Sequence, residues 1–178
     1  MREASSFHPL QNGGRRRAAV AIHRHAVAGG DRKPRAGDLP RAGAMLQLQD
    51  RLGDAVQAAG VRPEDVELAS IYDDYPTMVL AQLNDLGLIP GNDLARFARR
   101  DIGERRFPLN TWGGMLSAGQ PGGPAGGLNG ISEAVLQLQH RAGARQVKDA
   151  RLAVTSGYGM TMYRYGGTAA AAILERME

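Results

Sequence analysis

Cysteine is absent from this chain of 178 residues. That absence excludes a disulfide-stabilised scaffold, a thiolate metal site and any mechanism that depends on a cysteine nucleophile of this chain. Histidine is also scarce, and three of the four histidines (His8, His23 and His25) lie near the start of the chain. Because nothing around them would hold these side chains in place, the sequence predicts no metal site.

Long hydrophobic runs are missing as well. The longest uncharged stretch covers residues 107–132, but it is rich in glycine and contains Pro108, Pro121 and Pro124. Such a segment would leave backbone groups without hydrogen-bond partners in lipid, so we predict no membrane span. The start of the chain has no continuous apolar core of the length that a secretory signal requires. We therefore expect a cytoplasmic protein.

Acidic residues are few in the first quarter of the chain, where residues 1–45 hold nine Arg or Lys against three Asp or Glu. Residues 1–44 also lack a sustained hydrophobic period, so we predict a basic, disordered arm there and a folded domain over residues 45–178. Two other interpretations of the arm stay open. One is a nucleic-acid-binding segment built on Arg15–Arg17, which the lack of interleaved aromatic residues disfavours. The other is an arginine-rich organelle leader.

Beyond residue 45, hydrophobic spacing predicts helices and strands, with Pro76 opening one helix that ends at Gly87. The predicted helices cover residues 45–59, 76–86, 93–100 and 128–141, and the predicted strands cover residues 66–72, 150–156 and 163–174. This order predicts an α/β fold, with helices layered on a mixed sheet that ends in an antiparallel strand pair. In the helix over residues 128–141, the residues expected to face the core are Ile131, Val135, Leu136 and Leu138.

Three polar or glycine-rich turns follow predicted strands or precede predicted helices, at residues 72–76, 110–127 and 156–160. In α/β sheets such ends are where ligands bind, because helix N-termini and free amides face one crevice. Asp73 and Asp74 are adjacent, and neighbouring residues of an extended chain point to opposite sides. We therefore expect at most one of them in the site. Asp74 either caps the helix that begins at Pro76 or takes part in catalysis.

The glycine-rich turn matches neither the dinucleotide-binding nor the phosphate-loop pattern. Its backbone is therefore expected either to approach a ligand closely or to pack tightly. Ser117 and Ser156 are available hydroxyls, but the sole histidine beyond the arm, His140, is placed away from the turn by the helix register. A serine-hydrolase arrangement is therefore disfavoured.

Tyrosine is the more informative residue type. All five tyrosines of the chain lie at predicted strand ends or beside the turns: Tyr72, Tyr75, Tyr158, Tyr163 and Tyr165. Tyr163 and Tyr165 alternate along a predicted strand and are expected to pack. Tyr158 stands between Gly157 and Gly159, with little local reason to be buried. Its phenol can donate to an oxyanion or act as an acid or base.

At these same turns the chain resembles the C-terminal half of the thiolase superfamily, in the branch of the lipid-transfer-protein (sterol carrier) thiolases. The resemblance covers residues of about 48 to 176 and rests on AGVRPEDV (59–66), IYDDY (71–75), VLAQLNDLG (79–87) and the segment from NTWGG (110–114) to residue 127. Together, in this order, these segments are specific, whereas any one alone would be weak evidence. The resemblance implies a thiolase-like half.

The departures from that pattern bear on the chemistry. Gln120 stands where working thiolases carry a histidine in the glycine loop, and residues 154–159 contain no counterpart of their second catalytic cysteine. The resemblance places the nucleophilic cysteine in an N-terminal half, which this sequence lacks. A Claisen condensation needs a thiolate to carry the acyl group and a base to form the enolate. The chain by itself is therefore not expected to be a thiolase.

Tyrosine-rich loops of this kind are similar to those of the lipid-transfer-protein aldolases. These enzymes of steroid and lipid metabolism cleave a β-hydroxyacyl-CoA by a retro-aldol step, beside an acyl-CoA-binding partner of the DUF35 kind. The resemblance implies Tyr158 and Tyr75 as acid and base, with Tyr72 and Asp74 as second choices. It also implies that Gln120 and amides of the glycine loop polarise the thioester oxygen. The full list of expected oxyanion and substrate residues is Gln120, Gly119, Gly122, Gly157 and Gly159.

The resemblance further implies acyl-CoA as substrate with no other cofactor, a thiolase-like N-terminal half as partner and homodimers in the full-length family. In such a fold the active site lies between two similar halves, so the isolated chain is expected to be inactive. Acyl transfer in place of aldol cleavage stays open. The alternative, of a different class, is a degenerate, non-catalytic fragment that serves as an interaction module.

Overall fold

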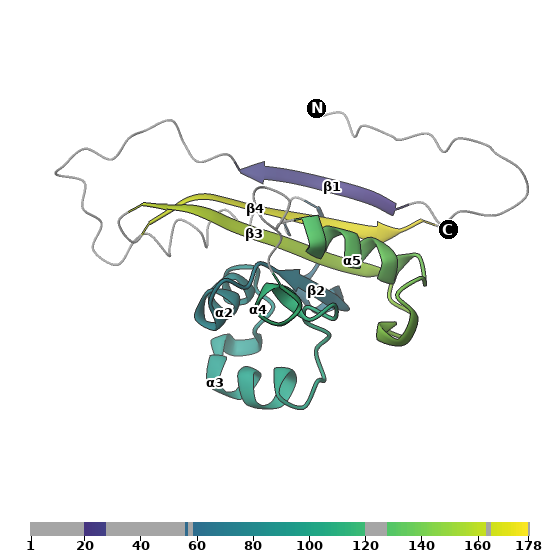
Figure 1. Ribbon diagram of the computed structural model, residues 1–178, viewed down its shortest axis with the longest axis horizontal. Helices are drawn as coiled ribbons and strands as arrows, with labels where there is room; N and C mark the ends of the chain where they lie inside the picture. Colours follow the sequence, from purple (N-terminus) through teal and green to yellow (C-terminus); the bar gives the residue numbers. More distant parts are fainter. Residues whose placement is uncertain (1–19, 28–55, 57–58, 120–127, 163–164, 178) are drawn as a thin grey trace, which may run out of the picture.

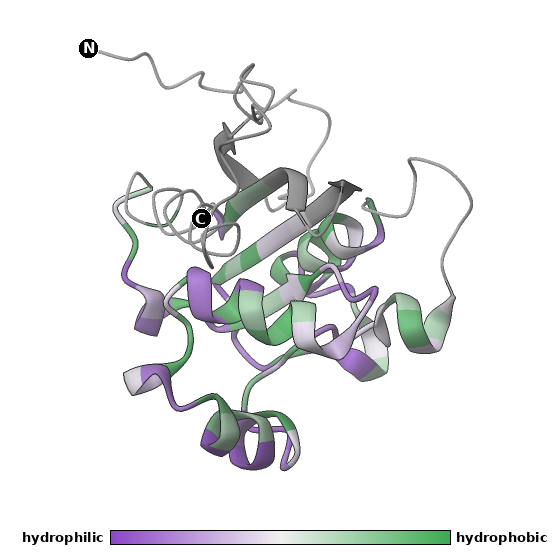
Figure 2. Ribbon diagram, turned by 90° about the vertical axis from the view of Figure 1, so that its left-hand side faces the viewer, coloured by the Kyte–Doolittle hydropathy of each residue, from purple (hydrophilic) through white to green (hydrophobic). Residues whose placement is uncertain are grey.

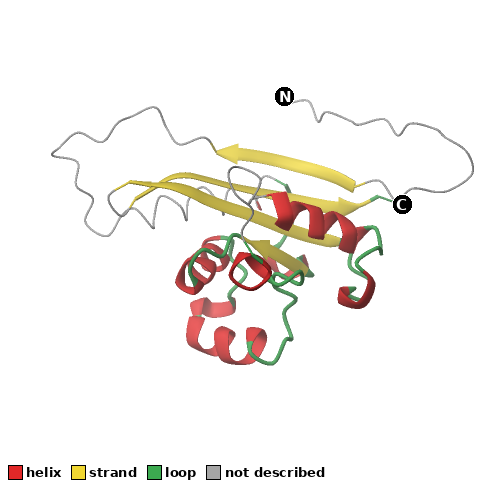
Figure 3. Cartoon of the chain, viewed as in Figure 1, coloured by secondary structure: helices red, strands yellow, loops and turns green. Residues whose placement is uncertain are grey.

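Four strands form one mixed sheet in the order β1-β4-β3-β2 (Figures 1 and 3). The computed structural model describes residues 20–27, 56, 59–119, 128–162 and 165–177. The strands are β1 (Val20–Val27), β2 (Leu68–Ile71), β3 (Leu152–Met162) and β4 (Tyr165–Arg176). β2 is parallel to β3, whereas β4 is antiparallel to both of its neighbours. The predicted mixed sheet with an antiparallel final pair is confirmed.

The β3–β4 hairpin is longer than the sequence predicts. A turn is expected at residues 156–160, but β3 continues through them, with Gly157 opposite Ala170 and Gly159 opposite Thr168. The predicted turn is wrong because pairing along β4 satisfies the backbone groups of these glycines, and this tertiary pairing outweighs their low strand propensity.

Helices cover both faces of the sheet. Among the described elements, α2 (Pro76–Asp85) and α5 (Leu128–Leu138) pack against it. Successive strand residues point to opposite faces, so each face has its own core. The core that joins the strands to α5 consists of Leu68, Ala134, Leu138, Ala150, Ala153 and Leu174. The larger core toward α2 includes Ala69, Ile71, Val79, Leu83, Val154 and Ile173.

α2 begins and ends where the sequence predicts. Pro76 occupies its first turn, where the missing N–H costs nothing, and Gly87 follows its end with a left-handed φ of +74°. A predicted helix near residue 93 is also confirmed. Asp93 caps α3 (Leu94–Arg96) by accepting the N–H of Arg96 at 3.0 Å. This helix continues as the π-helical η3 (Phe97–Ile102), which lies at the bottom of Figure 2 and carries strongly hydrophilic residues.

The remaining helices are short: η1 (Pro63–Asp65), η2 (Pro90–Asn92), α4 (Gly114–Ala118) and η5 (Gly143–Arg145). The predicted helix over residues 45–59 lies mostly outside the described residues, although Val56 is helical and buried. In the part of the chain that the structure describes, every helix is too short or too polar to cross a lipid bilayer.

The buried face of α5 differs from the prediction. Leu138 is buried and Val135 packs against the core, as expected, but Ile131 is 36% exposed. The polar residues Glu133 and Gln137 are buried in its place. They are buried because a hydrogen-bond network, described below, satisfies their polar groups.

A strand also lies within the arm. The sequence predicts disorder over residues 1–44, yet residues 20–27 form β1, which pairs with β4 from Val20 opposite Arg176 to Val27 opposite Ala169. The sequence pattern does not predict this strand. The unpaired edge of β4 offers backbone partners that no local sequence signal reveals. The rest of the arm lies outside the described residues.

Candidate active site

A pocket of about 380 Å³ lies beside the carboxyl end of β2, where Ile71 pairs with Ser156 in the middle of β3. The carboxyl end of a parallel strand is where α/β proteins bind ligands. Three chain segments that the sequence singles out line it, together with parts of α5 and β4. The lining residues are Ser70, Ile71, Tyr72, Asp73, Trp112, Met115, Gly130, Ile131, Thr155, Ser156, Gly157, Ala170, Ala171 and Ala172.

The strand register leaves room for this pocket on the α5 face of the sheet. Ser70 pairs with Thr155 and Thr155 pairs with Ala172, so three small side chains share one face. α5 can approach closely because a Cβ at Gly130 would lie only 3.2 Å from the Cβ of Ser70. Small residues on the strands and a glycine in the helix therefore form the floor and the wall.

Asp73 fixes one side of the pocket. Its buried carboxylate accepts the N–H of Met115 at 2.8 Å and that of Leu116 at 3.3 Å, so it caps α4 from a distant part of the chain. A Cβ at Gly114 would lie 2.1 Å from Oδ2 of this carboxylate, and Gly114 has a φ of +70°. Only glycine allows this approach, so Asp73 and Gly114 together position the start of the glycine-rich loop.

Asn110 attaches the same loop to the edge of β2. Its side-chain Oδ1 accepts the N–H of Ile71 at 2.7 Å, and its Nδ2 donates to the Ile71 carbonyl at 2.9 Å. The backbone joins as well, since Ala69 donates to Pro108 and Asn110 donates to Ala69, each at 2.9 Å. The segment thus pairs with β2 almost as a further strand would, which places Trp112 beside the end of β2.

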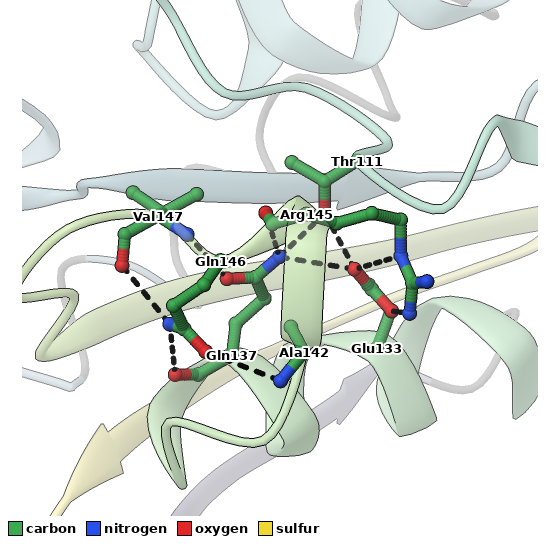
Figure 4. Close-up of polar contacts among 7 residues, drawn as sticks. All are labelled: Thr111, Glu133, Gln137, Ala142, Arg145, Gln146 and Val147. Carbon is green, nitrogen blue, oxygen red and sulfur yellow. Dashed lines mark hydrogen bonds and ion pairs between the residues drawn. The ribbon is translucent and has the colours of Figure 1, made fainter.

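A polar network behind the pocket ties the loop to α5 and η5 (Figure 4). Glu133 accepts the hydroxyl of Thr111 at 2.8 Å and forms a two-point ion pair with Arg145, at 3.1 and 2.9 Å. The side-chain amide of Gln137 donates to Thr111, Glu133 and the Arg145 carbonyl, and its Oε1 accepts the N–H of Val147. Both buried polar residues of α5 are therefore satisfied.

The pKa of Glu133 reflects this network. Burial acts to raise the pKa, but hydrogen bonds from Arg145, Thr111 and Gln137, with the positive charge of Arg145, outweigh it and hold the pKa below its ordinary value. Glu133 therefore stays ionised, which is what a bidentate pair with arginine requires.

Gln82 joins α2 to the residue after β2 and to the middle of β3. It is fully buried, donates to the carbonyl of Tyr72 at 2.9 Å and accepts the hydroxyl of Ser156 at 2.9 Å. The sequence offers Ser156 as an available hydroxyl. In the structure this hydroxyl donates to the side-chain amide of Gln82, and no histidine is among the described residues of the lining, so a serine-hydrolase arrangement stays disfavoured.

Two polar atoms of the lining have no hydrogen-bond partner in the part of the chain that the structure describes. They are the hydroxyl oxygen of Ser70 and the indole nitrogen Nε1 of Trp112, and both are inaccessible to solvent. A buried polar group without a partner is costly, so these two atoms are a local cost to the fold of this chain. Nothing in the sequence pattern singles out either residue, apart from Trp112 being the one tryptophan.

Some of the predicted site residues line the pocket and others do not. Tyr72 and Gly157 line the pocket. Tyr75 is 66% exposed and Asp74 is exposed, and neither is part of the lining. Of the two adjacent aspartates, Asp73 lines the pocket and Asp74 does not.

The other predicted residues lie on the glycine loop and on β3. Gly119 follows α4 with a φ of +99°, at the last described position before a gap. Gln120 and Gly122 lie outside the described residues. Tyr158 and Gly159 are in β3, directly after the lining residue Gly157, with Tyr158 opposite Ala169 of β4. Among the described residues, no group of three His, Asp or Glu side chains is arranged to hold a metal ion.

Comparison with known proteins identifies the family. A family model described as thiolase C-terminal domain-like matches residues 45–176. The chain belongs to this thiolase-like family. The match begins at the residue where the sequence analysis places the start of the folded domain, and it confirms the resemblance stated there.

The curated relatives of this thiolase-like chain fall into the expected branch. Acetyl-CoA acetyltransferase of Methanothermobacter thermautotrophicus is 31% identical over 125 residues, which cover 69% of this chain and 31% of that protein. Sterol carrier protein 2 of Rattus norvegicus is 33% identical over 119 residues, which cover 62% of this chain and 21% of that protein. The steroid side-chain-cleaving aldolase of Thermomonospora curvata is 34% identical over 106 residues, which cover 57% of this chain and 26% of that protein. The chain thus spans about a third or less of these relatives.

A solved structure supports the same fold. A chain of the "Ltp2-ChsH2(DUF35) aldolase" superposes with a TM-score of 0.58 at 24% identity, covering 89% of this chain and 39% of that one. At this identity the likeness establishes the fold of the thiolase-like chain.

Proposed function

We propose that this chain is the C-terminal portion of an enzyme that acts on acyl-CoA thioesters and cleaves a carbon–carbon bond of a β-hydroxyacyl-CoA by a retro-aldol step. The observation that carries the proposal is the pocket beside the end of β2, whose described lining includes tyrosine, serine, threonine and glycine residues and no histidine, in a chain without cysteine. The named activities of two relatives, acetyl-CoA acetyltransfer and steroid side-chain cleavage, agree with a thioester and a lipid or steroid side chain.

The chemistry fits these residue types. In a retro-aldol step a base removes the proton of the β-hydroxyl, the bond between the α and β carbons breaks, and a carbonyl compound leaves. The electron pair becomes a thioester enolate, which an acid then protonates at carbon. None of these steps needs a covalent acyl carrier. A chain without cysteine can therefore contribute to aldol cleavage, whereas acyl transfer would need a thiolate from elsewhere.

Two tyrosines are assigned to the acid and base roles. Tyr158 keeps the role that the resemblance implies, since it follows the lining residue Gly157 in β3. Tyr72 takes the second role ahead of Tyr75, because Tyr72 lines the pocket and Tyr75 does not. Asp74, which is exposed, stands last. Gln120 and the amides of the glycine loop are proposed to polarise the thioester oxygen.

Partners complete the proposal. A thiolase-like N-terminal half would supply the other side of the active site, and a DUF35-type protein of the kind named with the aldolase structure would bind the acyl-CoA. The assembled enzyme is proposed to be a cytoplasmic homodimer, with acyl-CoA as substrate and no further cofactor.

A chimeric enzyme tests the activity. Residues 45–178 replace the corresponding part of the Thermomonospora curvata aldolase, the chimera is purified with its DUF35 partner, and mass spectrometry follows the products. We expect a β-hydroxyacyl-CoA to give a carbonyl compound and a shortened acyl-CoA. Products from a β-ketoacyl-CoA plus free CoA instead would mean acyl transfer. If a folded chimera gives neither, the chain is the non-catalytic interaction module.

Tyrosine variants of an active chimera test the residue roles. Tyr158→Phe and Tyr72→Phe each remove one phenolic proton and keep the ring, so we expect kcat to fall at least ~10²-fold. Tyr75→Phe serves as the matched control outside the pocket lining and is expected to keep kcat within about threefold. Turnover near the parent level in Tyr158→Phe would remove that tyrosine from the mechanism.

A further inference from the structure

A closed ring of hydrogen bonds holds the backbone of Tyr72, the residue that follows β2. The N–H of Tyr72 donates to the Ser156 carbonyl at 3.0 Å. The Tyr72 carbonyl accepts the side-chain amide of Gln82 at 2.9 Å, and the oxygen of that amide accepts the Ser156 hydroxyl at 2.9 Å. Each of the three residues is therefore bonded to the other two, and both Tyr72 and Ser156 line the pocket.

The side chain of Gln82 is itself held in one orientation. It is fully buried, and its amide nitrogen also donates at 3.0 Å to the carbonyl of Met78, one turn earlier in α2. Two carbonyl oxygens thus face the nitrogen end of the amide, and carbonyls only accept hydrogen bonds. The amide oxygen cannot take that place, so it points toward Ser156.

An amide at this position is costly unless its hydrogen bonds are used. The neighbouring core residues of α2 are hydrocarbon, Val79 and Leu83, and a buried amide loses its hydration where they do not. A hydrocarbon side chain in place of Gln82 would fill the space but would leave the Tyr72 carbonyl and the Ser156 hydroxyl without these partners. The specific contribution of glutamine here is therefore the link between the two pocket segments.

Gln82 acts at a distance from any ligand. It has no exposed surface and is not among the described lining residues, so it cannot contact a substrate in the pocket. The backbone of Tyr72 is fixed through both its N–H and its carbonyl, which fixes the Cα from which the phenol projects. Displacement of a reacting group by about 1 Å can lower a rate steeply.

We propose that Gln82 is a positioning residue that sets the place of Tyr72 relative to β3 and thereby the place of its phenol in the pocket. The meaning of this for catalysis rests on the proposed function, in which Tyr72 acts as acid or base. The positioning itself is a property of this chain. The competing explanation is that Gln82 only packs α2 against the sheet.

A fluorine label measures the positioning without any reaction. The full chain is produced with 3-fluorotyrosine, and each ¹⁹F signal is assigned by its loss in a Tyr→Phe variant. Gln82→Met keeps a long unbranched side chain but removes the amide, so we expect the Tyr72 signal to move by more than its linewidth. The signal of Tyr75, whose side chain is 66% exposed, should stay in place. An unchanged Tyr72 signal would overturn the proposal.

Val79→Ala is the matched control for packing. It removes buried hydrocarbon from the same helix and no hydrogen bond, so the Tyr72 signal should stay in place. In an active chimera, Gln82→Met should lower kcat at least ~10-fold and change KM by less than about threefold, because Gln82 touches no ligand. Val79→Ala should keep kcat within about threefold. Equal losses of kcat in the two variants would mean that Gln82 acts through packing alone.

Gln82→Glu tests the hydrogen bond to Tyr72 more directly. A protonated carboxyl can donate to the Tyr72 carbonyl and accept from Ser156, as the amide does, and burial favours the protonated form. At pH 6, kcat of Gln82→Glu should therefore exceed that of Gln82→Met at least about fivefold, each taken relative to the parent chimera. Equal kcat in the two variants would contradict the role of this hydrogen bond.

The positioning and the proposed function fail separately. A parent chimera that cleaves no substrate would contradict the proposed function, and the fluorine signals of the full chain would still support or overturn the positioning by Gln82. An active chimera that keeps its kcat in Gln82→Met would overturn the positioning role and leave the proposed function in place.

Discussion

Gly114 is the residue on which the start of the glycine-rich loop depends. Its left-handed φ of +70° and the closeness of the Asp73 carboxylate both exclude a side chain. We expect Gly114→Ala to lower the free energy of unfolding by at least about 2 kcal/mol more than Gly91→Ala. Gly91 is the matched control, because it has a φ of +63° but nothing within 4 Å of the added Cβ.

Urea denaturation of both variants measures this difference. Gly91→Ala should cost about 1 kcal/mol, the price of a left-handed alanine alone. Similar unfolding midpoints for the two variants would mean that the Asp73 carboxylate moves aside easily and does not fix the loop.

The contribution of Glu133 to the stability of the fold depends on pH. Its pKa is lowered in the folded state, so the stability that it contributes is present above its unfolded pKa of about 4.5 and is lost as the pH falls through the lower folded value. Glu133→Gln should reduce the free energy of unfolding by about 1–3 kcal/mol at pH 7, because the two-point ion pair with Arg145 is lost.

Denaturation of wild type and Glu133→Gln between pH 7 and pH 3 tests this sign. The gap should be widest at pH 7 and should close below about pH 4.5. Glu104→Gln, which removes an exposed ion pair with Arg106, is expected to cost less than about 0.5 kcal/mol. A constant gap at all pH values would show that shape, and not charge, explains the effect.

At the scale of elements, α2 ends on an unfavourable charge. Asp85 is its last residue, and burial raises the pKa of this carboxyl from 3.8 to about 6. A negative charge at a helix C-terminus also opposes the helix dipole. Because the folded pKa is raised, the neutral carboxyl supports the fold below about pH 4, and this support is lost as the pH rises through about 6.

Asp85→Asn removes the carboxyl, and with it the loss of stability that its ionisation causes. At pH 7 the variant should be more stable than wild type by about 1 kcal/mol, less than the full pKa shift implies because solvent still screens the charge. Thermal unfolding across pH 4–8 measures the gain, which should grow between pH 4 and pH 6 and then level off. A variant that is less stable at pH 7 would mean that Asp85 has a charged partner in the folded protein.

Elements with strong local signals were predictable from the sequence, and those set by distant pairing were not. α2 was predicted because Pro76 and Gly87 mark its ends. The extension of β3 past Gly157 was missed because its cause is the register with β4. The buried side of α5 differs from the prediction because Arg145 pairs with Glu133 and the backbone of Arg145 and Val147 satisfies Gln137, contacts that periodicity does not reveal.

The same distinction applies to the candidate site. The positions of the three segments at strand and helix ends predict that they meet, and Tyr72, Trp112 and Gly157, one residue from each segment, line the same pocket. The importance of Ser70 and Asp73 depends on which face each strand residue takes and on contacts across the fold. Composition and spacing do not contain that information.

At the scale of the whole molecule, β1 covers an edge of the sheet. It pairs with β4 along eight residues, and the paired segment of β4 includes the alanines 169–172. Exposed edge strands promote association between chains. Deletion of residues 1–44 should therefore lower solubility and produce dimers or larger species in size-exclusion chromatography with light scattering.

A full-length variant in which residues 20–27 are replaced by a glycine–serine stretch of equal length is the control for the rest of the arm. It should associate as the deletion does. If both variants remain monomeric and as stable as wild type, β1 is dispensable for covering this edge.

The order of the chain has a consequence for folding kinetics. β2 is early in the domain and its parallel neighbour β3 is late, with α2, α4 and α5 between them. Contacts between residues so distant in sequence form slowly, because a long loop must close before they stabilise anything. A nascent chain released before residue 152 would therefore hold most of its helices and no binding cavity at all.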